Sequence, residues 1–157
     1  MTEFLGDKFT MGDGTECGRE AVDGYKLIMV VYSASWWGGC GPFKASLKNF
    51  YNTWNADGAK NLQVVIVSGD KDQGGYDSTM RECPWVALPF GADKGAYEAK
   101  IPCTGYPTPG IINAATGDVI EADAFGKVSD EHYQQWMAAC NWAWLNPYKI
   151  DTQKHIN

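Results

Sequence analysis

Residues 27–40 read LIMVVYSASWWGGC, and this stretch decides the fold. The run Leu27–Tyr32 is apolar and rich in β-branched residues, which is typical of a strand. A short turn of small residues, Ser33-Ala34-Ser35, follows it. From about Gly41 to Asn55, aromatic and aliphatic side chains recur at spacings of three and four, which predicts an amphipathic helix packed on a sheet. The stretch is therefore a strand, a turn and a helix.

A junction of this kind is suited to cysteine chemistry. The first turn of a helix has free N–H groups and the positive end of the helix dipole, and both stabilise a thiolate. Cys40 is the cysteine in this stretch, and Trp37 lies three residues before it. The sequence therefore places one thiol at the junction, without a second one beside it.

Five motifs extend this pattern along the chain. They are Tyr32 to Trp36 (YSASW), Leu47 with Phe50-Tyr51, Val64 to Asp70 (VVIVSGD), Pro84 to Phe90 (PWVALPF), and Tyr106-Pro107-Thr108. In this order, from about residue 10 to residue 145, they resemble the tryparedoxin and nucleoredoxin branch of the thioredoxin superfamily. The resemblance, together with the alternation of strand and helix patterns, predicts an α/β fold: a thioredoxin-like three-layer sandwich with a mixed central sheet flanked by helices.

The resemblance assigns roles to the residues of the turn. The family site reads Ser-Ala-Ser-Trp-Cys-Pro-Pro-Cys, so Trp37 takes the place of the nucleophilic cysteine and Cys40 that of the resolving one. A rival register reads Cys40-Gly41-Pro42-Phe43-Lys44 as a site that has lost its second cysteine. We prefer the first register, because the distances from Trp36 to the motifs that follow it then need no insertion.

The resemblance also implies a peptide-binding rim. Tyr106-Pro107 is expected to be a cis peptide bond, and in the family the backbone before that proline pairs with an extended substrate segment. The rim would comprise the residues Trp36, Trp37, Trp85, Tyr106 and Pro107. The alternative is that Trp36 and Trp85 mostly pack and that Trp37 alone is exposed.

The remaining thiols and acids are expected to be of lesser importance. Cys40 is predicted to be a buried and mostly inert thiol, and Cys17 and Cys140 to be small apolar core residues. Cys83 and Cys103 lie in segments near the active-site face, and either would replace the missing thiol only by coming within disulfide distance of Cys40. Ordinary thioredoxins have a buried acid where this chain has Val31. The nearest acid by motif, Glu82, is expected to be a solvated surface residue.

Composition limits the other classes of function. A net charge of −6 disfavours nucleic acid as a partner. Closely spaced pairs of Cys and His are lacking, so we expect no metal site and no cofactor. Asp70-Lys71-Asp72 resembles the start of a calcium loop but lacks the third acidic position and the distal Glu, which favours a plain polar loop.

The length of 157 residues suits a single thioredoxin-like domain over 1–157, with a core of about 10–145 and short terminal extensions. Apolar runs of membrane-span or signal-peptide length are lacking, so we expect a soluble intracellular protein. The cytoplasm is the expected compartment, and an organelle is the alternative.

Further elements follow from turn signals and periodicity. We expect strands near Glu16–Val22, lying close to the central strand, and at Leu62–Ser68, with a hairpin of 110–113 and 119–122. Short helices are expected within 70–83 and 93–100, and a last helix from the capping pattern Ser129-Asp130-Glu131-His132 to about Trp144.

Two functions fit this reading. The first is a redox-inactive, degenerate relative of the tryparedoxins and nucleoredoxins that binds a protein or an extended peptide segment, as a scaffold or as a subunit of a larger assembly. The second is an atypical monothiol thiol–disulfide oxidoreductase that uses Cys40. Trp37 favours the first, because it cannot attack a disulfide.

Overall fold

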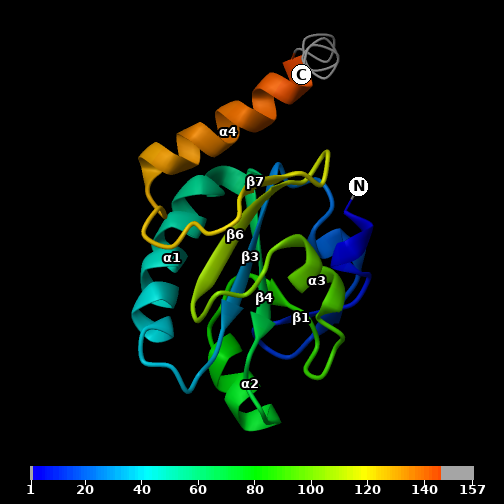
Figure 1. The fold of residues 1–157 in the computed structure, drawn as a ribbon, viewed down its shortest axis with the longest axis vertical. Helices are drawn as coiled ribbons and strands as arrows, with labels where there is room; N and C mark the ends of the chain where they lie inside the picture. The colour runs from blue at the N-terminus through cyan, green and yellow to red at the C-terminus, as the bar shows by residue number, and fades with distance from the viewer. Residues whose placement is uncertain (1, 146–157) are drawn as a thin grey trace.

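The computed structural model describes the backbone of residues 2–145 and the side chains of residues 2–140. A mixed seven-stranded sheet of order β2-β1-β5-β4-β3-β6-β7 forms its middle layer (Figure 1). The strands are β1 (Phe9–Met11), β2 (Glu16–Cys17), β3 (Leu27–Ser33), β4 (Leu62–Ser68), β5 (Val86–Ala87), β6 (Thr108–Asn113) and β7 (Val119–Glu121). The helices are α1 (Cys40–Trp54), α2 (Gln73–Met80), α3 (Gly95–Lys100) and α4 (Asp130–Leu145), with 3-10 turns η1 (Glu3–Leu5), η2 (Arg19–Ala21) and η3 (Ala56–Gly58).

The central strands β3 and β4 set the position of the site. Every residue of both strands is buried, as expected for strands covered on both faces. They run parallel, in a register that pairs Leu27 with Leu62 at one end and Ser33 with Ser68 at the other. Both strands therefore end at the same edge of the sheet, and the loops that follow them lie next to each other.

Helices cover the two faces of the sheet and complete the three layers. Met29 and Val31 of β3 face a core that includes residues of α1, α2 and α4, whereas Ile28 and Val30 face a core with α3 and η1. Trp54 of α1 stacks on Tyr133 of α4, with ring centroids 4.3 Å apart and an interplanar angle of 5°. This contact explains why α4 begins beside the end of α1 in Figure 1.

Most of the predicted elements are present. Leu62–Ser68 is a strand with the bounds expected, the hairpin is β6 and β7, and α2 and α3 lie within the predicted segments. Helix α4 begins at Asp130, and the Ser129 hydroxyl accepts a hydrogen bond from the N–H of His132 at 3.3 Å, as the capping pattern predicts. Trp144, its predicted end, lies beyond the described side chains.

The prediction of a strand over Glu16–Val22 near the central strand is wrong. The strand ends at Cys17 and lies at the edge of the sheet, four positions from β3. Residues 19–21 form η2 instead, because the Glu20 carboxylate accepts a hydrogen bond from the N–H of Gly18 at 2.8 Å and closes a local turn. The core also begins earlier than residue 10, since Leu5 and Phe9 are completely buried.

Gly110 of β6 provides a test of the packing between the sheet and α3. A Cβ atom added there would lie 2.5 Å from Cδ1 of the fully buried Ile101. We therefore expect Gly110→Ala to lower the free energy of unfolding by about 1–3 kcal/mol in urea titrations. The control is Gly41→Ala, because a Cβ on Gly41 would meet nothing within 4 Å. Equal stability of the two variants would contradict the packing described here.

Candidate functional site

The turn between β3 and α1 presents two indoles outward and one thiol inward. The side chains of Trp36 and Trp37 are 54% and 53% exposed, whereas Cys40, the first residue of α1, is 6% exposed. The Cys40 N–H donates to the Trp37 carbonyl at 3.2 Å. A Cβ atom on Gly39 would lie 3.2 Å from Nε1 of Trp37, so this indole lies against the turn. The turn therefore exposes aromatic surface where an accessible thiol would be needed for exchange chemistry.

A third aromatic side chain, Tyr106, lies against Trp36 on this surface. Their ring centroids are 5.2 Å apart in an edge-on arrangement, and the Trp36 indole N–H donates to the Gly69 carbonyl at 3.1 Å. Gly69 is in close contact with this pair, because a Cβ atom there would lie 2.5 Å from the phenol ring of Tyr106. The peptide bond between Tyr106 and Pro107 is cis, as the sequence predicts.

Asp70 holds this arrangement together, and its role was missed at the sequence level. Its Oδ1 accepts hydrogen bonds from the N–H and the hydroxyl of Ser35, at 2.8 and 2.6 Å. Its Oδ2 accepts from the hydroxyls of Ser68, at 2.7 Å, and of Thr79 in α2, at 2.5 Å. One buried carboxylate thus joins the turn after β3, the end of β4 and α2.

These hydrogen bonds also decide the charge of Asp70. Burial raises the pKa of its carboxyl group, but the bonds from Ser35, Thr79 and Ser68 lower it more, so that the pKa lies below its ordinary value. Asp70 is therefore a carboxylate with all its acceptor positions used. The signal in the sequence was the pair of hydroxyl-bearing segments, Ser33-Ala34-Ser35 and Ser68-Gly69-Asp70, at the ends of two adjacent parallel strands.

Two residues of the predicted rim, Trp85 and Pro107, are buried in the structure. Trp85 is only 1% exposed and packs edge-on against Tyr51, with ring centroids 5.4 Å apart. It therefore belongs to the core, where it lies with Leu47 and Tyr51 of α1. Pro107 is buried beneath the cis turn, and Trp36, Trp37 and Tyr106 supply the accessible aromatic surface. Glu82 is exposed, as expected for a solvated glutamate.

Phe125 is an exposed aromatic residue in the loop between β7 and α4, and the sequence motifs do not single it out. It is 62% exposed, and it follows Ala124, whose N–H donates to the Pro109 carbonyl at 2.7 Å. That bond ties the loop between β7 and α4 to the chain two residues after Pro107. The predicted pairing of β6 with β7 does not reveal this bond, because the loop follows the hairpin and is not part of it.

All five cysteines are free thiols, so neither Cys83 nor Cys103 is bonded to Cys40. Burial raises the pKa of Cys83, although Lys44 and Lys48 oppose the shift, and burial raises the pKa of Cys140 to about 11. Cys103 is partly exposed, and its thiol donates to the Gly105 carbonyl at 3.4 Å.

Comparison with known proteins agrees with this geometry. A family model described as thioredoxin-like matches residues 24–119, which include the β3–α1 turn, Asp70 and the cis-proline. The chain belongs to the thioredoxin-like family. Tryparedoxin of Trypanosoma brucei brucei is 32% identical over 110 residues, which are 68% of this chain and 74% of that protein. Nucleoredoxin of Danio rerio is 30% identical over 140 residues, or 83% of this chain, but the chain spans only 34% of that protein.

Solved structures show the same thioredoxin-like arrangement. The crystal structure of tryparedoxin I from Crithidia fasciculata superposes with a TM-score of 0.69 and 28% identity, covering 83% of this chain and 91% of that one. Tryparedoxin from Trypanosoma brucei gives a TM-score of 0.70 and 27% identity, covering 83% and 92%. The fold expected from the five motifs is therefore confirmed.

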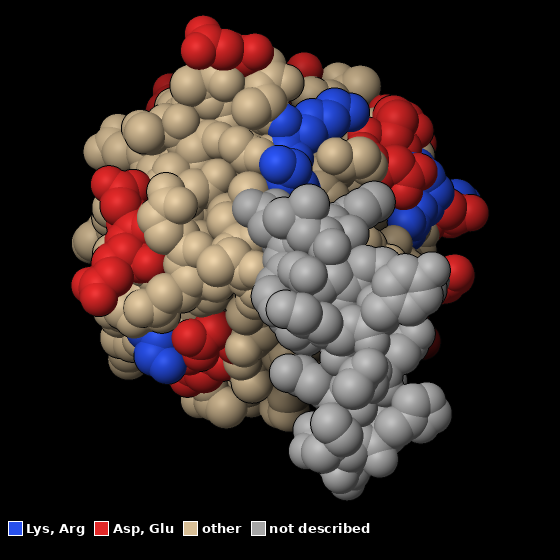
Figure 2. All heavy atoms as spheres, turned by 90° about the horizontal axis from the view of Figure 1, so that it is seen from above, with Lys and Arg blue, Asp and Glu red and all other residues tan. Residues whose placement is uncertain are grey.

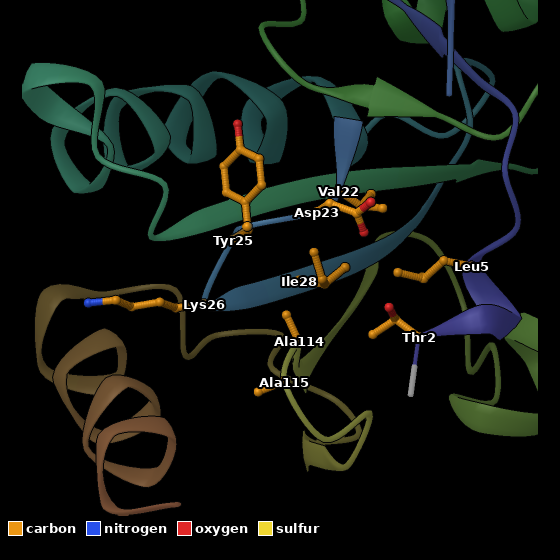
Figure 3. A pocket seen from close by; sticks show the side chains of 10 residues that line it. Thr2, Leu5, Val22, Asp23, Tyr25, Lys26, Ile28, Ala114 and Ala115 are labelled. Atoms are coloured by element: carbon orange, nitrogen blue, oxygen red, sulfur yellow. The ribbon is translucent and has the colours of Figure 1, made fainter. Parts of the chain in front are cut away.

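A separate hollow of this thioredoxin-like chain lies at the start of β3, at the opposite end of the strand from the turn (Figure 3). Leu5, Val22 and Ile28 form its apolar floor. The carboxylate of Asp23 at its edge is paired with Arg19 at 3.0 Å. This hollow therefore has no part in the chemistry of the turn.

The surface charge agrees with the net charge of −6. Figure 2 shows the upper end of the molecule, where Asp and Glu side chains surround the edge and Lys and Arg gather in only a few places. No helix within residues 2–145 is long and apolar enough to cross a bilayer. In the same part of the chain, no three His, Cys, Asp or Glu side chains are grouped so that they could hold a metal ion.

The Asp70 network makes a prediction about stability and pH. In Asp70→Asn an amide NH₂ would face hydroxyl and N–H donors, so we expect the free energy of unfolding to fall by about 2 kcal/mol or more. Because the folded pKa is lowered, the stabilisation is present above the unfolded value near 3.9 and is lost as the pH falls through the folded value.

Urea unfolding at about pH 7 and about pH 3 would measure this effect, since the difference between wild type and variant should shrink at the lower pH. Asp77→Asn is the control, because Asp77 is an exposed carboxylate on α2, the helix whose Thr79 donates to Asp70. A difference that does not depend on pH would show that Asp70 does not act through its charge.

Proposed function

We propose that this thioredoxin-like chain binds extended peptide segments of a protein partner and does not catalyse thiol–disulfide exchange. The observation that carries the proposal is the exposed indole of Trp37, together with the burial of Cys40. Exchange needs an accessible thiolate to attack and a second thiol to resolve the mixed disulfide. An indole cannot attack, and a thiol that is 6% exposed is poorly placed to do so. The same burial weighs against a monothiol enzyme that uses Cys40.

The backbone beside the cis-proline supports peptide binding. Within residues 2–145, neither the N–H nor the carbonyl group of Tyr106 makes a main-chain hydrogen bond. These groups lie next to the Trp36–Tyr106 pair, so an extended segment can pair with them and place a side chain against the indoles. Exposed tryptophans on a fixed turn are typical anchors of such interfaces.

The loss of redox chemistry can be tested by restoring the missing thiol. We expect wild type to reduce insulin disulfides no faster than a free-thiol control, and Trp37→Cys to gain measurable dithiol activity with Cys40. Recovery should be partial, because the buried Val31 supplies no carboxylate to assist proton transfer. Trp37→Ser, which adds no thiol, is the matched control. Wild-type turnover well above the free-thiol control, or failure of Trp37→Cys to form a disulfide on mild oxidation, would contradict the assignment of the turn.

The binding role of Trp37 can be tested with a displayed library of random dodecapeptides selected on the immobilised chain. Trp37→Ala should weaken binding of the selected peptides by roughly 2 kcal/mol, about 30-fold, with little change in melting temperature. Val119→Ala is the control, because Val119 is also exposed but lies on the edge strand β7. Equal binding by wild type and Trp37→Ala would refute the proposed anchor.

A further inference from the structure

A large hollow lies between the β1–β2 hairpin, α2 and the loop after β5. Its volume of about 570 Å³ is in the range of ligand sites. Two of the exposed large hydrophobic side chains of the molecule line it, Met11 at 41% and Phe90 at 40%. The Phe90 ring packs on Tyr76 with centroids 5.7 Å apart, so it is held in place at the surface. The hollow therefore offers apolar contact to a side chain from outside.

The walls of this hollow are fixed by close contacts. The Tyr76 hydroxyl donates to the Leu88 carbonyl at 2.7 Å, which ties α2 to the loop after β5. A Cβ atom on Gly12 would lie 2.5 Å from the Cys83 carbonyl oxygen, so the hairpin fits tightly against the chain that follows α2. Binding here would need little reordering of the protein, which favours affinity.

The charge around the hollow is negative. Three carboxylates line it, those of Asp13, Glu16 and Asp77, against the single guanidinium of Arg81. In the described part of the chain, none of the three carboxylates pairs with a Lys or Arg side chain. The N–H of Thr15 donates to Asp13 at 2.9 Å, and this bond lowers the pKa of Asp13 and keeps it charged. A cationic side chain would complement these groups.

Two smaller hollows lie between the large hollow and the aromatic rim, and shared lining residues link them. Ser35, Trp36 and Asp70 line a smaller hollow beside the turn, and Asp70 also lines the next one along the surface. That second hollow shares Tyr76, Pro89 and Phe90 with the large one. Lys94, which lies along this path, donates to the Ser68 carbonyl and is thereby engaged within the protein. Three adjoining hollows, linked by shared lining residues, thus lie between Trp36 and Met11.

We propose that a peptide bound at the rim continues along this surface and places a Lys or Arg, with an apolar neighbour, in the large hollow. The apolar residue contacts Met11 and Phe90, and the cationic group lies among Asp13, Glu16 and Asp77. This inference rests on the proposed function, because it extends the same peptide site and gives it a preference for basic, apolar segments.

The test uses a displayed library of random dodecapeptides on the full chain. Peptides selected by wild type should be enriched in Lys or Arg next to apolar residues. A selected dodecapeptide should bind the double variant Asp13→Asn with Asp77→Asn about tenfold more weakly at low salt, as expected for lost charge complementarity. The control, Asp93→Asn with Asp118→Asn, removes the same charge outside the hollow and should bind like wild type.

The outcomes separate the two proposals. Selected peptides without basic residues, or equal losses in both double variants, would overturn the basic preference, while a loss with Trp37→Ala would still support the rim. Peptides that depend on Asp13 and Asp77 but bind Trp37→Ala normally would overturn the rim and its continuity with the hollow. A wild-type selection that yields no peptides would overturn both.

Discussion

The carboxylate of Asp70 is the constraint on which the exposed turn depends. Strands β3 and β4 run parallel and in register, so their loops begin side by side, but nothing in the sheet itself fixes the path of those loops. Asp70 supplies that link through its bonds to Ser35, Ser68 and Thr79. A buried ionised group is tolerated because every bond it accepts replaces one lost from water. The buried Asp70 carboxylate therefore fixes the turn that carries Trp36 and Trp37.

On the exposed side of the turn, the aromatic side chains of Trp36 and Trp37 form the surface. The Trp36 indole N–H donates to the Gly69 carbonyl, and its ring packs edge-on against Tyr106. Three segments that are distant in sequence therefore meet at Trp36. Among the side chains of residues 2–140, no ring pairs with Trp37, which remains at the surface beside Gly39. The two neighbouring tryptophans therefore have different roles: one joins segments of the protein, and the other is available to a partner.

The sequence predicted the elements with strong, local signals. The apolar runs of β3 and β4, the periodicity of α1, the cap of α4 and the cis-proline are all present, because each depends on neighbouring residues. Burial of Cys40 also agrees with its position inside the first helical turn. The errors involve long-range packing. The motif predicts Trp85 at the rim, with packing as the alternative, and the structure packs it on Tyr51. Asp70 has its partners only because three separate segments meet there. Contacts between distant segments produce no periodic pattern in the sequence, so the sequence alone does not predict them.

The close fit between Gly69 and Tyr106 limits how this site can change. The phenol ring occupies the space that any side chain at position 69 would need, and the carbonyl of the same residue receives the Trp36 indole. A bulkier residue at 69 would have to displace the ring at 106 or be matched by a smaller residue there. The two positions are therefore coupled, because a side chain introduced at 69 would compete with the Tyr106 ring for the same volume.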